Sequence, residues 1–310
     1  MVDLKINIKD AFLEEEERCD YNVEKKIKEV WAVELDLFAE FDRVCKKYNI
    51  PYFADGGTIL GTIRHKGFIP WDDDIDLAMR RDDYDKLCNH ADDFEFPYFL
   101  QTNYTDPGSL RGHAQLRNSL TTGALEYETG RWINQGIFID IFPIDNVPDD
   151  EKEFEIQKKR IINYKKKAIR YGRNVFITDN ENKIKNAIKK ALLKLGFGKI
   201  ARKLENHYYS KMEIECQKYN NTETRNCSLL SFQCDWKRLI RENQDYKSVV
   251  MMPFEFVELP IPVGYDKVLT NLYGDYNKII MNSSAHGGII FDTDIPYEEY
   301  LKQKYNNKYY

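Results

Sequence analysis

Residues 71–77 read WDDDIDL, which places four aspartates within seven residues. From Asp74 to Leu77 polar and apolar side chains alternate, as they do along a β-strand with one buried face. On such a strand Asp74 and Asp76 point to one side, and Ile75 points to the core. Two neighbouring carboxylates repel each other unless a cation lies between them, and Mg²⁺ prefers such oxygen ligands. The segment is therefore either a metal site or, like most runs of like charge, a solvated acidic loop.

The segment before the aspartates favours the metal site. Residues 24–48 are predicted to form a helix, because apolar residues recur there at three- and four-residue steps. Residues 51–58 then read PYFADGGT, a short apolar strand that runs into two glycines. Glycines at such a position allow backbone N–H groups to approach a phosphate closely.

Asp140 is the second feature that favours a metal site. It lies alone in residues 136–143, GIFIDIFP, a strand that we expect to end at Pro143. A lone carboxylate among apolar neighbours is costly unless it is paired or bound to metal. A third acid beside Asp74 and Asp76 would complete such a site.

The overall composition excludes several classes of protein. The chain has 310 residues, of which 42% are hydrophobic, and a net charge of -5, so neither a nucleic-acid-coating protein nor a disordered polyelectrolyte is expected. No apolar run of about 20 residues predicts a membrane span. The N-terminus lacks a signal pattern, which favours a cytoplasmic location. The scattered cysteines are expected to be reduced thiols, and the alternative is a structural zinc site at Cys216, Cys227 and Cys234.

The charge of residues 151–220 differs from that of the whole chain. These residues hold 19 lysines and arginines against 8 acids and are predicted to be mostly helical. In residues 183–195 the lysines flank or oppose an apolar arc. This helix therefore either has a solvated lysine face or lies on an anionic membrane surface. Nucleic acid is not expected as a partner, because the basic stretch lacks interleaved aromatic residues and a known binding module.

The order of the motifs resembles a known superfamily. A Gly-Gly pair, Asp-x-Asp on a strand and a third carboxylate on a neighbouring strand resemble the nucleotidyltransferases, and the LicD family more closely. The closer resemblance is carried by residues 53–76, 136–145 and 272–276. It implies an α+β fold, with a nucleotidyltransferase-like mixed sheet, packed helices and a helical insertion. The expected parts are a catalytic core (1–150), a basic helical insertion (151–225) and a C-terminal part that completes the core (226–310).

The resemblance also implies an activity. LicD proteins transfer phosphocholine from CDP-choline to sugars of surface glycans, and the similar fukutin-related proteins use CDP-ribitol. We therefore expect a metal-dependent phosphotransferase. It would move phosphocholine, or a similar phospho-alcohol, from a CDP-alcohol to a hydroxyl of lipopolysaccharide, teichoic acid or capsule, and release CMP. A lipid-linked acceptor would bring the protein to the inner membrane face. The alternatives are transfer of a nucleoside monophosphate and a non-catalytic protein that binds nucleotide or glycan.

The matching residues receive roles through this resemblance. Asp74, Asp76 and Asp140 are the expected catalytic carboxylates and bind Mg²⁺ or Mn²⁺. Asp140 is also a candidate to accept the proton of the acceptor hydroxyl. Asp72 is expected on the same strand face as Asp74 and is a further candidate metal ligand, whereas Asp73 is expected to point away.

The donor phosphates need N–H groups and cations. The candidate donor-binding residues are Asp55, Gly56, Gly57, Thr58, Arg64, Lys66, Arg111 and Gln115. The forked guanidinium of Arg64 suits phosphate oxygens, and the alternative is an ordinary surface cation. Polar residues alternate from Arg111 to Arg117. On a strand they would form either a wall of the donor pocket or the wet face of an edge strand.

Overall fold

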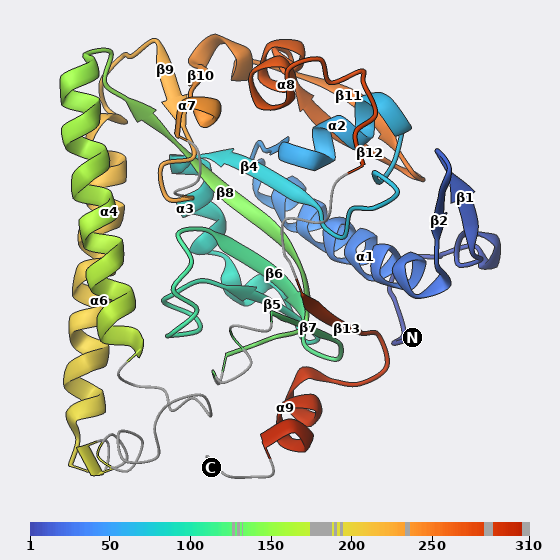
Figure 1. The fold of residues 1–310 in the computed structure, drawn as a ribbon, viewed down its shortest axis with the longest axis horizontal. Coiled ribbons are helices and arrows are strands. Elements are labelled where there is room, and N and C mark those ends of the chain that lie inside the picture. The colour runs from blue at the N-terminus through green and yellow to red at the C-terminus, as the bar shows by residue number, and fades with distance from the viewer. Residues whose placement is uncertain are drawn as a thin grey trace.

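The computed structural model describes residues 1–125, 128, 131, 133–173, 188, 191–192, 195–232, 236–281 and 288–305 (Figure 1). A curled mixed sheet forms its centre. The strands of this sheet are β3 (Phe53–Ala54), β4 (Asp76–Arg80), β5 (Tyr98–Gln101), β6 (Ala114–Asn118), β8 (Ile137–Val147), β9 (Asn226–Ser228) and β10 (Arg241–Glu242). They are ordered β10-β9-β8-β4-β3, and β6 joins β5 to β8.

Smaller strand pairs and helices surround this sheet. The pairs are β1 (Glu16–Arg18) with β2 (Tyr21–Val23), β7 (Thr122–Leu125) with β13 (Ile289–Asp292), and β11 (Val249–Phe254) with β12 (Val257–Pro262). The described helices are α1 (Lys25–Tyr48), α2 (Gly56–His65), α3 (Arg81–Cys88), α4 (Glu151–Arg173), α6 (Phe197–Cys216), α7 (Trp236–Leu239), α8 (Tyr265–Tyr273) and α9 (Tyr297–Tyr305). The predicted α+β class is confirmed.

Helix α1 forms where the apolar spacing predicts it and packs along β6 and β8. Its fully buried apolar residues include Val30, Val33, Leu37, Phe41 and Val44. Burial of each such side chain contributes about 1.5–3 kcal/mol. The helix ends where Asn49 adopts a left-handed conformation (φ 50°) and donates its N–H to the carbonyls of Cys45 and Lys46.

Strand β4 begins at Asp76, later than the sequence predicts. Its parallel partner β8 pairs with it from Asp140 onward, and its antiparallel partner β3 pairs only with residues 77 and 78. Within the described chain no strand pairs with Asp74, so residues 72–74 form an irregular segment that leads into β4. The prediction that Asp74 and Asp76 share a strand face is therefore wrong.

Strand β8 continues past Pro143, so the expected stop at this residue is also wrong. The N–H of Asp140 donates to the carbonyl of Ile75 (2.9 Å), so the N–H groups of alternate residues from 140 onward point toward β4. Residue 143 faces the other side of the strand. On that side the pairing of β8 with β6 stops at Ile141, and the pairing with β9 starts at Asp145. A proline in this gap interrupts no ladder hydrogen bond.

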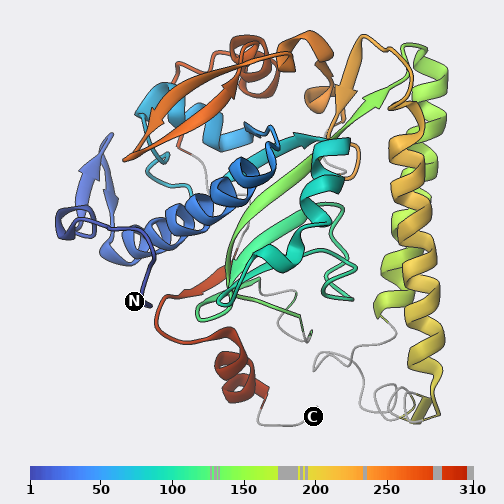
Figure 2. The same cartoon turned by 180° about the vertical axis from the view of Figure 1, so that it is seen from behind.

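Helices α4 and α6 run side by side along one side of the molecule (Figures 1 and 2). Their facing apolar side chains form a separate buried cluster with Val147 and Leu230 at the edge of the sheet. Both helices lie in the predicted insertion, although the division into three parts remains a prediction. Among the described residues, no helix is long and apolar enough to cross a membrane.

Candidate functional site

The centre of the site is a row of polar side chains across four strands. Asp76 of β4 lies opposite Asp140 of β8 in the sheet register. Gln115 of β6 lies opposite Asp140 on its other side, and Gln101 of β5 lies opposite Gln115. Residues paired in this way project to the same face of a sheet. The strand pairing thus brings two carboxylates and two amides into one line.

Asp74 joins the two aspartates of this row. One carboxylate oxygen from each of Asp74, Asp76 and Asp140 lies within 4.8 Å of the other two. This spacing fits one hard divalent cation, because metal–oxygen distances are about 2.1 Å for Mg²⁺ and about 2.3–2.6 Å for Ca²⁺. The structure therefore brings together the three residues predicted as catalytic. Their role as metal ligands remains to be tested.

The electrostatics of this group also favour a cation. Burial, followed by the charges of Asp74 and Asp140, raises the pKa of Asp76 well above its ordinary value. Without a metal ion, each negative charge in this group therefore costs free energy. A divalent cation would remove this repulsion and favour the ionised carboxylates.

Asp72, Asp73 and Asp74 form a second close group, also with one oxygen each within 4.8 Å. The expectation that Asp73 points away from its neighbours is wrong, because the three residues lie in an irregular segment and not on a strand. Asp72 belongs to this second group and not to the group around Asp76. The indole N–H of Trp31 on α1 donates to the carbonyl of Asp72 (3.0 Å) and so fixes the segment against the helix.

The two glycines that begin α2 make room for these carboxylates. A Cβ on Gly56 would lie 2.4 Å from an oxygen of Asp76, and a Cβ on Gly57 would lie 2.6 Å from an oxygen of Asp72. Gly56 also has a φ of +50°, which disfavours a side chain. The N–H of Gly57, in the first turn of α2, is placed where a helix favours an anion, whereas the N–H of Gly56 donates to the side chain of Asp55.

Asp55 and Thr58 connect α2 to the sheet. The side chain of Asp55 accepts the N–H of Gly56 (2.7 Å) and forms a buried ion pair with Arg241 (2.6 Å). The hydroxyl of Thr58 accepts the backbone N–H of Asp76 (2.8 Å). Both were predicted to bind the donor. The structure gives each of them a contact that positions the start of α2 or of β4.

Two side chains fix the carboxylate of Asp140. The Nε2 atoms of Gln115 and His113 lie 2.6 and 3.2 Å from the same oxygen, Oδ1. Burial lowers the pKa of His113, so the imidazole is neutral at neutral pH and contacts Asp140 through a hydrogen bond rather than an ion pair. Two donors on one oxygen hold the carboxylate in one orientation.

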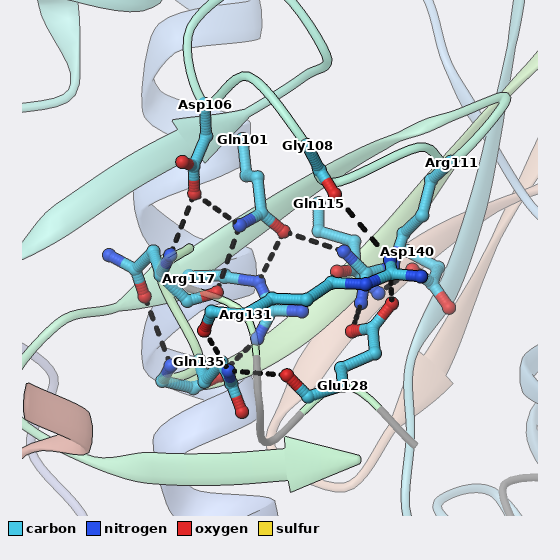
Figure 3. A network of polar contacts seen from close by, with 12 residues as sticks. Gln101, Asp106, Gly108, Arg111, Gln115, Arg117, Glu128, Arg131, Gln135 and Asp140 are labelled. Carbon is cyan, nitrogen blue, oxygen red and sulfur yellow. Dashed lines mark hydrogen bonds and ion pairs between the residues drawn. The ribbon is translucent and has the colours of Figure 1, made fainter. Parts of the chain in front are cut away.

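Arg117 supports this contact from behind (Figure 3). It donates to Oε1 of Gln115, to Oε1 of Gln101 (2.7 Å) and to the carbonyl of Gly136 (2.7 Å). Because Arg117 occupies the amide oxygen of Gln115, the amide NH₂ group faces Asp140. Burial lowers the pKa of Arg117 to about 9.

Arg111 belongs to the same network. It forms an ion pair with Glu128 and donates to Oε1 of Gln101 (2.9 Å). It precedes β6, which begins at Ala114 and is paired on both sides by β5 and β8. The edge-strand alternative is therefore wrong. Arg111 and Gln115 both lie in this network. Neither residue lines either of the two pockets described below, so donor contacts by these residues remain a prediction.

Two pockets open beside the carboxylates. The aromatic pocket has a volume of about 370 Å³, and its walls include Asp76, Phe142, Phe232 and Leu239. The mixed pocket has a volume of about 320 Å³, and its walls include Arg64, Trp71, Asp72 and Tyr276. The residues that line both pockets are Gly57, Arg238, Leu272 and Tyr273. The two pockets therefore meet next to Gly57.

Residues 49–175 match the sequence model of the family described as LicD/FKTN/FKRP, nucleotidyltransferase domain. This part of the chain resembles the LicD family. The chain is also 29% identical over 263 residues to the lipopolysaccharide cholinephosphotransferase LicD of Haemophilus influenzae, a match that covers 82% of this chain and 92% of that protein. The resemblance inferred from the motifs is confirmed.

Shorter parts of the chain match two uncharacterized proteins. RP689 of Rickettsia prowazekii is 37% identical over 69 residues, which are 22% of this chain and 24% of that protein. T07A5.1 of Caenorhabditis elegans is 34% identical over 104 residues, which are 34% of this chain and 25% of that protein.

The site extends beyond the matched LicD domain. Arg238 lines both pockets and donates to the carbonyl of Leu272, and Arg241 holds Asp55. Sequence reasoning missed both arginines, because no motif marks residues 225–264. It did find the LicD closing motif at residues 272–276, part of which lines both pockets.

The two cations predicted after the glycines of the LicD motif differ in position. Arg64 lines the mixed pocket, and its NH1 donates to the carbonyls of Tyr276 (3.1 Å) and Lys278 (3.3 Å). Lys66 is exposed at the end of α2, in a left-handed conformation (φ 55°), and lies in the lining of neither pocket. Donor binding by either residue remains a prediction.

Two further expectations lie partly outside the described residues. Cys234, needed for the zinc alternative, is not described, whereas Cys216 and Cys227 are buried. Of the basic helix at residues 183–195 only residues 188, 191, 192 and 195 are described, and all four are exposed. Neither expectation is tested by the structure.

Proposed function

We propose that this LicD-family protein is a transferase that moves phosphocholine from CDP-choline to a hydroxyl of lipopolysaccharide or a related surface glycan and releases CMP. Mg²⁺ or Mn²⁺ at Asp74, Asp76 and Asp140 assists the transfer. The observation that carries the proposal is a close group of three carboxylates beside two pockets in a LicD domain. The named H. influenzae relative supports choline as the alcohol and lipopolysaccharide as the acceptor.

The residues of the site have distinct tasks in this reaction. When bound, the cation neutralises charge on the donor phosphates and on the departing CMP. The acceptor oxygen bonds to the phosphorus that carries choline, while the bond from that phosphorus to the CMP oxygen breaks and its electron pair leaves with CMP. Asp140 takes the hydroxyl proton, and Gln115 and His113 hold its carboxylate in place. The first turn of α2 offers N–H groups to a donor phosphate.

We place choline in the aromatic pocket. The rings of Phe142 and Phe232 meet there edge to face, with centroids 4.9 Å apart. Phe142 follows Asp140 by two residues on β8, so both side chains project to the same face of the sheet. Aromatic faces attract a quaternary ammonium group through cation–π contacts. The cytidine then occupies the mixed pocket, where Trp71 and Tyr276 offer stacking surfaces.

The insertion brings a lipid-linked acceptor within reach in this proposal. Exposed apolar side chains gather near the described start of α6: Ile188, Leu192, Leu195, Phe197 and Ile200. The surrounding segment is rich in lysine and arginine, a combination that favours the surface of an anionic membrane. We propose peripheral contact with the cytoplasmic leaflet. Flotation with anionic liposomes at low salt tests this contact, and failure to float removes the membrane part of the proposal alone.

A comparison of donors tests the transfer itself. The protein is incubated with Mg²⁺, lipopolysaccharide and one of CDP-choline, CDP-ribitol, CDP-glycerol or CDP-ethanolamine, and CMP release is followed. We expect release from CDP-choline that depends on both the metal and the acceptor. Pyrophosphate release from a nucleoside triphosphate, without CMP release from any of the four donors, would instead establish nucleotidyl transfer. Binding of CDP-choline without turnover would indicate a non-catalytic protein.

A further inference from the structure

Helix α1 carries a buried carboxylate that the proposed reaction does not use. Glu34 is 1% exposed, and neither of its side-chain oxygens has a hydrogen-bond partner among the residues that the structure describes. The other buried acids of this helix differ. Asp36 accepts the hydroxyl of Tyr98 (2.6 Å), and Glu40 forms an ion pair with Arg43 (2.8 Å). A buried carboxylate without such a partner is costly unless a proton, a water molecule or a bound cation compensates it.

The position of Glu34 on α1 directs it toward the acidic segment 72–74. Trp31 lies one helical turn before Glu34 and therefore on the same face, and its indole N–H donates to the carbonyl of Asp72. The electrostatics agree with this placement. Burial first, and then the charges of residues 72–74 and of Asp140, raise the pKa of Glu34 well above its ordinary value.

Residues 72–74 form a close group of ligand atoms distinct from the group around Asp76. The two groups share Asp74 only. We propose that Asp72, Asp73 and Asp74 bind a second divalent cation and that Glu34 completes this site from α1. The oxygens of Glu34 are not part of the close group, so Glu34 accepts hydrogen bonds from water molecules on the ion. Mg²⁺ and Mn²⁺ commonly retain such waters, and carboxylates around them strengthen binding.

This second site faces the mixed pocket. Asp72 lines that pocket together with Gly57, and an oxygen of Asp72 occupies the space that a side chain at residue 57 would need. An ion held there would meet the nucleotide half of the donor. The inference extends the metal dependence proposed above, yet it concerns cation binding alone and requires neither donor nor acceptor.

The test counts Mn²⁺ ions on the full-length protein without donor, by electron paramagnetic resonance of free Mn²⁺ during titration. We expect two ions per chain in the wild type. Glu34→Gln should weaken one of the two sites about 10- to 100-fold and leave the other unchanged. Asp140→Asn should instead weaken Mn²⁺ binding at the site formed by Asp74, Asp76 and Asp140. The matched control is Glu40→Gln, the same change at a paired carboxylate of the same helix, which should keep both sites.

Two results would overturn the inference. One is a single Mn²⁺ per chain in the wild type, and the other is Glu34→Gln with both affinities within about twofold of the wild type. If Glu34→Gln fails to fold, Asp73→Asn on the partly exposed segment 72–74 provides the test. This variant must weaken Mn²⁺ binding at the proposed second site. Two bound ions without CMP release would refute the proposed function alone, and one ion with CMP release would refute this inference alone.

Discussion

The two ends of the β4–β8 strand pair differ in how their charged side chains are arranged. At one end Asp76 and Asp140 bring like charges together. At the other end Arg81, which directly follows β4, donates from Nε and NH2 to the two oxygens of Asp145 on β8 (2.8 and 2.6 Å). Asn220 adds a third hydrogen bond to the same carboxylate (2.8 Å). At the Arg81 end opposite charges are paired, whereas at the Asp76 end like charges lie close together, as expected for a site that binds a cation.

This contrast identifies the site better than cavity size does. The pocket at the Arg81 end has a volume of about 440 Å³, which exceeds that of either pocket beside Asp76. Its charged residues include Arg80 and Arg81, which bond to Asn243 and Asp145 respectively. A buried charge with an opposite partner is compensated within the protein, whereas a group of like charges costs stability and is typical of a functional site. The proposed site therefore lies at the Asp76 end.

The largest expected effect comes from removing one like charge. Asp76→Asn should reduce CMP release at least about 10²- to 10³-fold, because it removes a group that acts on charge developing during transfer. The same change should raise the unfolding temperature in EDTA, since it relieves repulsion at a carboxylate whose pKa is raised by burial, Asp74 and Asp140. Activity assays and thermal unfolding measure the two effects. Full activity, or a lower unfolding temperature in EDTA, would contradict this interpretation.

Asp145→Asn should produce the reverse pattern at the paired end. Loss of this partner leaves the buried guanidinium of Arg81 with only the distant, half-exposed carboxylate of Asp85 (3.8 Å), which costs about 3–5 kcal/mol of unfolding free energy. Mn²⁺ affinity per folded molecule should not change. Urea unfolding and Mn²⁺ titration below the unfolding transition provide the readouts. A loss of unfolding free energy under about 1 kcal/mol would contradict the idea that charge pairing at the Arg81 end stabilises the protein.

Gln115→Met sharpens the comparison by changing the support of Asp140 without changing a carboxylate. We expect Mn²⁺ affinity at the Asp140 site to fall about 10- to 100-fold, because the amide that orients the carboxylate is lost. The matched control is Gln157→Met, which removes a buried glutamine that donates to the carbonyl of Glu215 in the α4–α6 pair. Equal losses of affinity in both variants would mean that Gln115 acts only through overall stability.

The local pattern around Asp76 was predictable from the sequence, but its exact strand limits were not. Alternation of Ile75 and Leu77, both buried, with the acids indicated strand β4. The apolar stretch at residues 136–143, with Asp140 as its single acid, indicated the neighbouring strand β8. The first residue of β4 depends on where β3 and β8 stop pairing, which is information from other segments. For the same reason Pro143 ended the predicted strand, although in the structure it occupies a gap between two partners of β8.

The residues that sequence reasoning missed act over long separations. Arg241 pairs with Asp55 across 186 residues, and the indole of Trp31 reaches the carbonyl of Asp72 across 41. Glu34 looked like an ordinary polar position on an amphipathic helix. Its burial follows only once α1 is packed along the sheet with residues 72–74 beside it. The carboxylates of the motif and the polar row that includes Gln115 were visible in the sequence, but the distant partners Trp31 and Arg241 were not.

The smallest expected effect concerns the donor alcohol and again contrasts the two ends of β8. Phe232→Leu keeps an apolar side chain in the aromatic pocket but removes a ring that faces Phe142. Cation–π contacts contribute about 0.5–2 kcal/mol, so the KM for CDP-choline should rise about 2- to 30-fold. The KM for CDP-glycerol, which has no cation, should change less than twofold. Ile144→Val in the pocket at the Arg81 end is the control and should alter neither KM. An equal rise for both donors would show that the ring contributes packing alone and would leave the position of choline to be found elsewhere.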